Sequence, residues 1–290
     1  MKQAIKWAAV WAVCGVAAAL AEPIIKDGQK LAFMGDSITQ FGAGQPGGYV
    51  RLVVSGLEAN GIKVAPVFAG ISGHKSNDML ARLDRDVLSK KPDFMTLSCG
   101  VNDVWHGERG VPLDAYKKNI TEICDKAQAA GVKVVVLTAT MIGEDQPNAN
   151  NQKLAAYNDF LRTLAKERQL PLADLNAEMQ AAVAAAKAAN APKPNRSNYL
   201  TSDGVHMAPP GDQMMAEGVL RALGLEAGQI AKAKAAWLAI PKAVNLKVSA
   251  AVSLAEYNRL MEAAAKEKLS CDEYVGTLLS KALDETSKGR

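Results

Sequence analysis

One serine of this chain stands where a nucleophile could be exposed at the rim of a sheet. Ser37 belongs to a Gly-Asp-Ser-Ile tetrapeptide that follows the apolar run 31–34, which is typical of a buried strand. A serine hydroxyl becomes a nucleophile only when a neighbouring base removes its proton. The Asp-Gly-Val-His segment 203–206 offers an imidazole with a carboxylate three residues before it. Asp203 could hold His206 in one tautomer, so we expect these two residues to activate Ser37 as a triad.

Two further positions could supply an anion-stabilising pocket. Attack of a serine on an ester converts the carbonyl oxygen into an anion, which needs hydrogen-bond donors already in place. Gly73 and Asn102 each follow another strand-like run. Glycine suits a position where the backbone approaches a substrate closely, and asparagine offers an uncharged amide donor. The sequence therefore contains candidates for both the nucleophilic and the anion-binding parts of an acyl-transfer site.

Four short motifs resemble, in order and spacing, those of the SGNH (GDSL-type) hydrolase family of esterases and lipases. They are GDSIT at 35–39, ISGHKSND at 71–78, GVND at 100–103 and DGVH at 203–206, and the similarity spans about residues 27 to 225. The resemblance implies an α/β fold, namely a three-layer flavodoxin-like arrangement with a central parallel sheet. We expect no metal or other cofactor, because none of the three histidines has a ligand cluster around it. The resemblance also implies an oxyanion hole made by the backbone N–H groups of Ser37 and Gly73 and the amide of Asn102.

Each motif also has a purely structural interpretation when it is taken alone. Ser37 could cap a helix or close a turn, Asp203 could cap a helix that begins near His206, and Asn102 with the aspartate after it is a common loop pair. We expect Asp36 to brace the nucleophile turn rather than to transfer a proton.

Four residues next to the motifs are candidates for substrate binding: Asp36, His74, Trp105 and His106. Neither His74 nor His106 has a carboxylate at the spacing of the last motif, so we expect them to line the pocket or to lie at the surface. Trp105 is expected to form a wall of the substrate cleft.

Strand-like runs alternate with amphipathic runs of helical length, the pattern of a parallel α/β architecture. Ligands bind such sheets outside the carboxyl ends of the strands, where Ser37, Gly73 and Asn102 fall. The expected strands are 30–35, 65–71, 94–99, 132–139 and 171–175, and the expected helices are 49–59, 77–89, 113–130, 151–167 and 212–223, with an alanine-rich surface helix at 179–191.

The composition agrees with a globular enzyme and limits the classes of partner that we expect. The 290 residues are 49% hydrophobic, enough for a large core, and the formal net charge is +4. There is no polybasic tract, so we expect neither a nucleic acid nor a stable membrane partner. Cys99, Cys124 and Cys271 remain after the N-terminal segment, and whether any of them forms a disulfide stays open.

The first 21 residues read as a signal peptide. Lys2 and Lys6 precede the uncharged, mostly apolar stretch 7–20, and a small-x-small pattern ends at Ala21. We therefore expect cleavage near Ala21 and export to the periplasm or the medium. The stretch is short for a membrane span, which makes an uncleaved anchor the alternative.

The chain divides into a signal peptide (1–21), a hydrolase domain (22–225) and a mainly helical C-terminal extension (226–290). The extension begins with an alanine-rich helix at 226–241, followed by an alternating run at 244–252 and two helices at 253–268 and 270–285. This order resembles a ribbon-helix-helix module, and a plain helical hairpin is the alternative. We expect a role in homo-oligomerisation rather than in binding DNA, which export would preclude.

The expected substrate is a short acyl ester on a small molecule or polysaccharide, with an O-acetyl group on a carbohydrate favoured. The loops 40–48, 105–112 and 142–151 lack the large apolar residues that a long acyl chain would need, and each methylene contributes about 0.8 kcal/mol only when apolar surface receives it. A lysophospholipase, lipase or thioesterase of the same family is the enzymatic alternative. A non-catalytic carbohydrate-binding or scaffold protein is the alternative of another class.

Overall fold

The computed structural model describes residues 22–191, 193, 197–244 and 251–288. They belong to two units, which adjoin in the sequence at Val244 and Asn245. The expected signal peptide lies outside the described residues. Within the part that the structure describes, no helix is long and apolar enough to cross a membrane.

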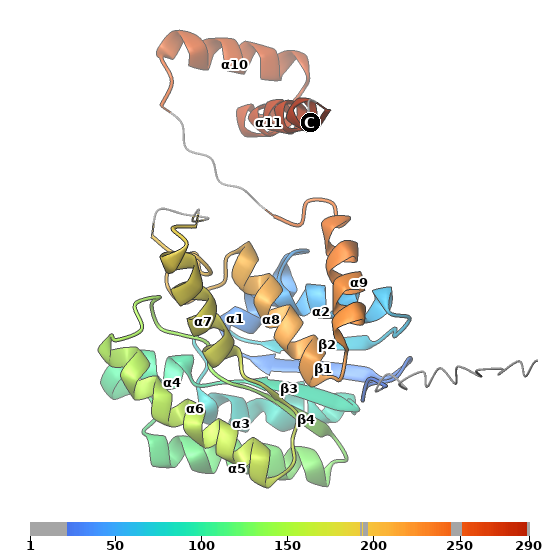
Figure 1. The fold of residues 1–290 in the computed structure, drawn as a ribbon, viewed down its shortest axis with the longest axis vertical. Coiled ribbons are helices and arrows are strands. Elements are labelled where there is room, and N and C mark those ends of the chain that lie inside the picture. The colour runs from blue at the N-terminus through green and yellow to red at the C-terminus, as the bar shows by residue number, and fades with distance from the viewer. Residues whose placement is uncertain (1–21, 192, 194–196, 245–250, 289–290) are drawn as a thin grey trace, which may run out of the picture. The chain divides into compact units, whose positions relative to one another are not determined.

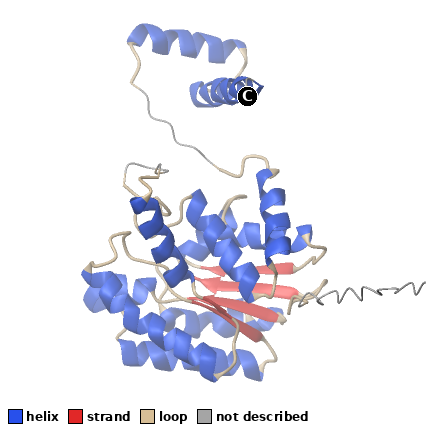
Figure 2. Cartoon of the chain, in the orientation of Figure 1, coloured by secondary structure: helices blue, strands red, loops and turns tan. Residues whose placement is uncertain are grey.

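A sheet of five parallel strands forms the centre of the first unit (Figure 2). The chain passes from β1 to β2 on one side and then crosses to β3 on the other, which gives the order β2-β1-β3-β4-β5. A ligand crevice is expected where the order reverses, between β1 and β3. The strands are β1 (Lys30–Gly35), β2 (Ala65–Gly70), β3 (Phe94–Ser98), β4 (Lys133–Leu137) and β5 (Leu172–Ala173).

Helices cover both faces of this sheet and complete three layers (Figure 1). One face carries α1 (Ser37–Gly44), α2 (Tyr49–Ala59), α7 (Leu175–Ala188), α8 (Pro209–Ala222) and α9 (Ala227–Leu238). The opposite face carries α3 (Ser76–Asp86), α4 (Val101–Trp105), α5 (Leu113–Ala129) and α6 (Ala149–Glu167), with short 3₁₀ turns η1 (Leu88–Lys90) and η2 (Gly107–Arg109). The expected three-layer flavodoxin-like α/β fold is confirmed.

The core lies between the sheet and these helices because the inner strands are apolar on both faces. β1 and β3 bury almost every side chain, and Phe33, Met34 and Phe94 are fully enclosed. Cys99 and Cys124 are buried free thiols, as expected of small core residues.

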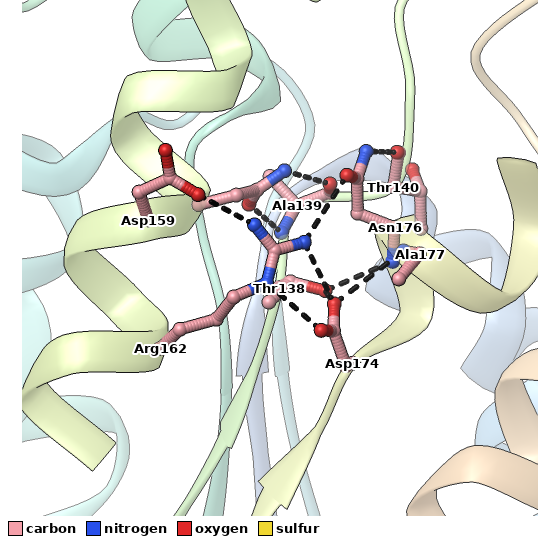
Figure 3. Close-up of polar contacts among 9 residues, drawn as sticks. Thr138, Ala139, Thr140, Asp159, Arg162, Asp174, Asn176 and Ala177 are labelled. Carbon is pink, nitrogen blue, oxygen red and sulfur yellow. Dashed lines mark hydrogen bonds and ion pairs between the residues drawn. The ribbon is translucent and has the colours of Figure 1, made fainter. Parts of the chain in front are cut away.

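A polar network ties the last strands to the helices beside them (Figure 3). The guanidinium of Arg162, on α6, donates to both carboxylate oxygens of Asp174 at 2.8 and 3.0 Å. Thr138, directly after β4, donates to Asp174 and accepts from the N–H of Asn176. Partial burial opposes ionisation of Asp174, but Arg162 outweighs it and holds the pKa of that carboxyl below its ordinary value. The network thereby fixes the start of α7 against β4 and α6.

The structure differs from the sequence-based expectation at three helices. α1 and α4, eight and five residues long, follow β1 and β3 and were not among the expected helices. α9 lies beyond the expected domain boundary at Leu225, yet it belongs to the first unit. Trp237 of α9 is buried and donates its indole N–H to the carbonyl of Leu52 at 2.9 Å, so packing on α2 extends this unit to Val244.

The second unit contains two helices, α10 (Leu254–Lys266) and α11 (Cys271–Lys288), which pack against each other. Ser253 caps α10 in a reciprocal bond pair with Glu256. Most of the alternating run expected at 244–252 lies outside the described residues. Several apolar side chains of these helices are exposed, namely Leu254, Tyr257, Met261, Leu278, Leu279 and Leu283. Homo-oligomerisation through the extension stays a prediction.

A partly buried carboxylate connects two helices on the same face as the nucleophile helix α1. Asp212 lies in the first turn of α8, and Tyr49 is the first residue of α2. The Asp212 carboxylate accepts from the backbone N–H of Tyr49 at 2.9 Å. The Tyr49 hydroxyl in turn lies 2.8 Å from the Thr39 hydroxyl on α1. Burial raises the pKa of Asp212 to about 7.

Asp212→Asn should make the protein more stable above neutral pH. Because the pKa of Asp212 is higher in the folded state (about 7) than in the unfolded state (about 3.9), folding loses stability as pH rises through this window. Asparagine keeps the acceptor for Tyr49 without the charge. We expect the variant to gain on the order of 2 kcal/mol over the wild type at pH 8 and almost nothing at pH 4.

Urea unfolding at both pH values measures the difference, with Asp84→Asn, at an exposed carboxylate, as the matched control. A gain that is the same at pH 4 and pH 8 would contradict a raised pKa of Asp212 in the folded protein.

Candidate active site

Ser37 is the first residue of α1 and comes two positions after the end of β1. Asp36 caps the helix, because its Oδ1 accepts from the N–H of Ile38 at 2.9 Å. Burial raises the pKa of Asp36 to about 6. The Asp36 side chain thus braces the turn, as expected from the sequence, while the Ser37 side chain keeps an opening to solvent, with 8% of the residue exposed.

The structure brings Ser37, His206 and Asp203 together in one hydrogen-bonded row. His206 Nε2 lies 2.9 Å from Ser37 Oγ, and His206 Nδ1 lies 2.7 Å from Asp203 Oδ2. An ionised carboxylate can only accept, so Nδ1 carries the hydrogen and Nε2 is free to accept from the serine hydroxyl.

Asp203 is anchored by its own turn. Its Oδ1 accepts from the backbone N–H groups of Val205 and His206 at 2.9 and 2.8 Å. Partial burial favours the protonated form, but the bond to His206 and these two backbone bonds outweigh it and hold the pKa of Asp203 below its ordinary value. Asp203 therefore stays an acceptor for His206 at neutral pH.

The backbone around this turn closes on itself and needs glycine at its tip. Thr201 and Met207 form an antiparallel bridge, and the N–H of Ser202 donates to the carbonyl of His206 at 2.8 Å. Gly204 has φ +99, a conformation that side chains with a Cβ rarely adopt. Its carbonyl accepts from the N–H of Gly143 at 2.7 Å, which ties the turn to the loop after β4.

Gly73 and Asn102 lie at the carboxyl ends of β2 and β3, beside the end of β1. Gly73 has φ +77, and open space surrounds the position of a Cβ there. Among the described residues, the N–H groups of Ser37 and Gly73 have no acceptor, so both are available to an incoming oxygen. The amide Nδ2 of Asn102 donates to the carbonyl of His74 at 3.1 Å and makes a long contact of 3.4 Å with Asp36.

The histidines next to the motifs hold the asparagine rather than the serine. His106 Nε2 lies 3.2 Å from Asn102 Oδ1, and because that oxygen can only accept, His106 donates and keeps the Nδ2 end of the amide turned the other way. The carbonyl of His74 fixes one hydrogen of the same amide. Burial and the neighbouring Arg82 charge lower the pKa of His74, so its ring is neutral at pH 7. Their expected role in substrate binding stays a prediction.

Arg82, on α3, is a site-supporting residue that the sequence analysis did not identify. Only 4% exposed, it donates to the carbonyls of Gly35 and Ala69 at 2.8 Å each, and to His74 Nδ1 at 3.0 Å. It therefore clamps the ends of β1 and β2 to the loop that carries Gly73. The lone arginine among the apolar positions of α3 was the available signal, but its partners are distant in sequence.

Two exposed aromatic rings lie beside the site residues. Phe41 is one helical turn after Ser37, and its ring centroid is 5.0 Å from that of His206. Trp105 packs beside His106, with centroids 6.2 Å apart. Phe41 and Trp105 are 47% and 45% exposed, so both offer flat apolar surface to a ligand. The sequence analysis named Trp105 but missed Phe41, although the i to i+4 spacing on α1 would have indicated it.

A surface hollow of about 410 Å³ lies apart from this serine. Gly107, Val111 and Leu113 line it with Tyr157 and other residues of α6, and neither Ser37 nor His206 contributes. In the described ranges, no group of three or more His, Cys, Asp or Glu side chains is arranged to hold a metal ion.

The arrangement as a whole is suited to acyl transfer. A hydroxyl faces an imidazole nitrogen that can take its proton, and a carboxylate orients the imidazole. Two backbone donors without an acceptor among the described residues and an amide lie at the strand ends. These are the groups that nucleophilic attack on an ester requires.

Comparison with known proteins agrees with this chemistry. Residues 33–214 match the model of the GDSL-like lipase/acylhydrolase family. An acetylxylan esterase from Geobacillus stearothermophilus is 28% identical over 70% of this chain and 97% of its own length, and its crystal structure superposes with a TM-score of 0.61. The crystal structure of an acetyl xylan esterase named AlAXEase is 33% identical, covers 67% of this chain and 98% of its own, and gives a TM-score of 0.60. The esterase TesA of Pseudomonas aeruginosa is 30% identical over half of this chain and 69% of its own.

The family match covers well over half of the chain and contains all four motifs entire. The resemblance seen in the motifs is thereby confirmed. This chain belongs to the GDSL-like lipase/acylhydrolase family and is a carboxylic ester hydrolase that acts on acyl esters.

Proposed function

We propose that this esterase is exported and removes acetyl groups from O-acetylated carbohydrate through an acyl-enzyme on Ser37. The observation that carries the proposal is the unbroken row of hydrogen bonds from Asp203 through His206 to Ser37, at 2.7 and 2.9 Å, at the carboxyl end of β1. Such a row makes a serine nucleophilic at neutral pH.

The proposed reaction has two halves. Ser37 Oγ attacks the ester carbonyl carbon while His206 Nε2 takes its proton, and the resulting oxyanion accepts from the N–H groups of Ser37 and Gly73 and from Asn102. Collapse of this intermediate expels the sugar hydroxyl, which receives the proton from His206, and leaves acetyl on Ser37. Water, deprotonated by the same imidazole, then releases acetate and restores the serine.

In this scheme, the Asn102 amide gives up its long contact with Asp36 and donates to the oxyanion instead. Its contact with Asp36 is 3.4 Å, whereas its bond to the carbonyl of His74 is 3.1 Å. The hydrogen directed at Asp36 is the one that a nearby oxyanion would attract, while the bonds from His74 and His106 keep the amide oriented.

The choice of an acetylated sugar rests on the relatives and on the surroundings of the site. Two relatives that match nearly all of their own length are acetylxylan esterases. Phe41 and Trp105 offer exposed rings against which a sugar ring can pack. The loops 40–48, 105–112 and 142–151 lack the run of large apolar residues that a long acyl chain would need. Export rests on the features of residues 1–21 alone.

Ser37→Ala and His206→Ala should each lower kcat by about 10⁴-fold or more, because one removes the nucleophile and the other the base. Asp203→Ala should cost less, since His206 can still accept a proton when its orientation is less fixed. Hydrolysis of p-nitrophenyl acetate measures the rates. A fluorophosphonate probe followed by mass spectrometry should label Ser37 in the wild type.

Ser89→Ala is the matched control, because this exposed serine lies on η1 and bonds the carbonyl of Arg85. Labelling that persists at another serine in Ser37→Ala would remove Ser37 from the mechanism. Full activity in Asp203→Ala would mean that another group orients the imidazole.

Asn102→Ala should lower kcat by roughly 10² to 10³-fold with little change in KM, since the amide binds an oxyanion that exists only transiently. Steady-state kinetics on p-nitrophenyl acetate separate the two constants. Asn119→Ala is the control, because that amide donates to Ser76 and has no role in the scheme. A kcat equal to the wild type in Asn102→Ala would show that Asn102 is no oxyanion donor.

The enzyme should release acetate from acetylated xylo-oligosaccharide, and its kcat/KM on p-nitrophenyl esters should fall from acetate through butyrate to octanoate. A longer chain gains free energy only where apolar surface receives it. Acetate release and ester hydrolysis provide the two measurements. A profile that rises toward octanoate, or cleavage of lysophospholipid without acetate release, would favour the lipase interpretation instead.

A further inference from the structure

Glu144 is a buried carboxylate outside the triad, in the loop between β4 and α6. It is 6% exposed, and within the part of the chain that the structure describes no lysine or arginine side chain pairs with its carboxylate. An ionised group in such a place needs strong compensation from hydrogen bonds. The hydrogen-bond donors around the carboxylate therefore indicate which segment of the chain it holds in place.

Among the described residues, four donors bond the Glu144 carboxylate, and all four belong to the segment that leads into the Asp203–His206 turn. Oε2 accepts from the N–H of Tyr199 at 2.6 Å. Oε1 accepts from the N–H of Leu200, the N–H of Thr201 and the Thr201 hydroxyl, each at 2.8 Å. Bonds to an ionised acceptor are about twice as strong as neutral ones, so this set fixes the base of the turn firmly.

The Thr201 hydroxyl links the Glu144 carboxylate to the Asp203–His206 turn. While donating to Glu144, it accepts from the N–H of Gly204 at 3.1 Å. Gly204 lies between Asp203 and His206, and its carbonyl accepts from Gly143, the residue before Glu144. The turn is therefore held to the Glu144 loop at its base and at its tip.

The Glu144 loop is itself rigidly placed by the start of α6. The Asn151 side chain accepts from the N–H of Ile142 at 2.8 Å and donates to the carbonyl of Gly143 at 2.9 Å. Lys187 of α7 donates to the backbone carbonyl of Glu144 at 3.2 Å. The carboxylate is thus held in place relative to the sheet, whose strand β1 ends two residues before Ser37.

We infer that Glu144 is a positioning residue that sets the Asp203–His206 turn at bonding distance from Ser37. The inference rests on the proposed triad and extends it to a residue that touches neither substrate nor nucleophile. Misplacement of a catalytic group by about 1 Å can cost on the order of 10²-fold in rate. The charge of Glu144 matters because an amide would direct its own NH₂ donor against the N–H donors of this segment.

Glu144→Gln should lower kcat for p-nitrophenyl acetate by about 10- to 100-fold while KM changes less than about threefold. Asp174→Asn is the matched control, because this carboxylate also holds a helix start but belongs to the network around Arg162 (Figure 3). It should lower stability and leave kcat near the wild-type value when both variants are assayed well below their unfolding temperatures.

A double-mutant cycle with Asp203→Ala separates positioning from general loosening of the fold. If Glu144 acts through the Asp203–His206 turn, Glu144→Gln should change kcat less than about threefold in the Asp203→Ala background. The inference is overturned if the two losses multiply, or if Glu144→Gln costs no more kcat than Asp174→Asn. A kcat equal to the wild type in Asp203→Ala itself would instead reject the proposed triad.

Thr201→Val tests the same link should Glu144→Gln fail to fold. Valine keeps the shape of threonine but removes the hydroxyl that joins Glu144 to Gly204. We expect a loss of kcat in Thr201→Val that Thr201→Ser restores. A Thr201→Val variant with wild-type kcat would overturn the inference.

Discussion

The level at which three parallel strands end is the constraint on which the rest of the site depends. Gly35 pairs with Gly70 across β1 and β2, and Met34 pairs with Leu97 across β1 and β3. Residues that follow these strands by a few positions must therefore emerge at one edge of the sheet. Strand register alone therefore brings a serine, a glycine and an asparagine from three distant segments to the same edge of the sheet.

Strand register alone does not fix loops, and buried polar side chains supply the missing precision. Arg82 bonds the carbonyls at the ends of β1 and β2, and Asp103 accepts from both the N–H and the hydroxyl of Ser76. Glu144 does the same for the segment before the acid–base turn. Each of these groups satisfies backbone donors or acceptors that irregular chain would otherwise leave unpaired in the interior. The buried polar side chains thus hold the loops of the site in place through hydrogen bonds that helices or strands would otherwise supply.

The sequence predicted the parts of the molecule that depend on local pattern. The expected strand at 30–35 and helix at 49–59 coincide with β1 and α2, because uninterrupted apolar runs and amphipathic spacing reflect burial directly. The short helices α1 and α4 were not predicted, since they begin at glycine-rich motifs that are typical of loops. The bonds from Arg82 to the carbonyls of Gly35 and Ala69, and from the segment 199–201 to Glu144, could not be predicted, because these partners lie 13 to 57 residues apart and only the folded topology brings them close.

Ser37 and His206 are separated by 169 residues, although the imidazole and its carboxylate are only three apart. The pair of Asp203 and His206 can form within its own turn, but the serine meets it only after the whole sheet has assembled and its face has been covered by α8. A nascent or unfolded chain thus contains every reactive group and none of the geometry. Ester cleavage becomes a property that switches on with completion of the tertiary structure, and the nucleophile stays an ordinary alcohol until then.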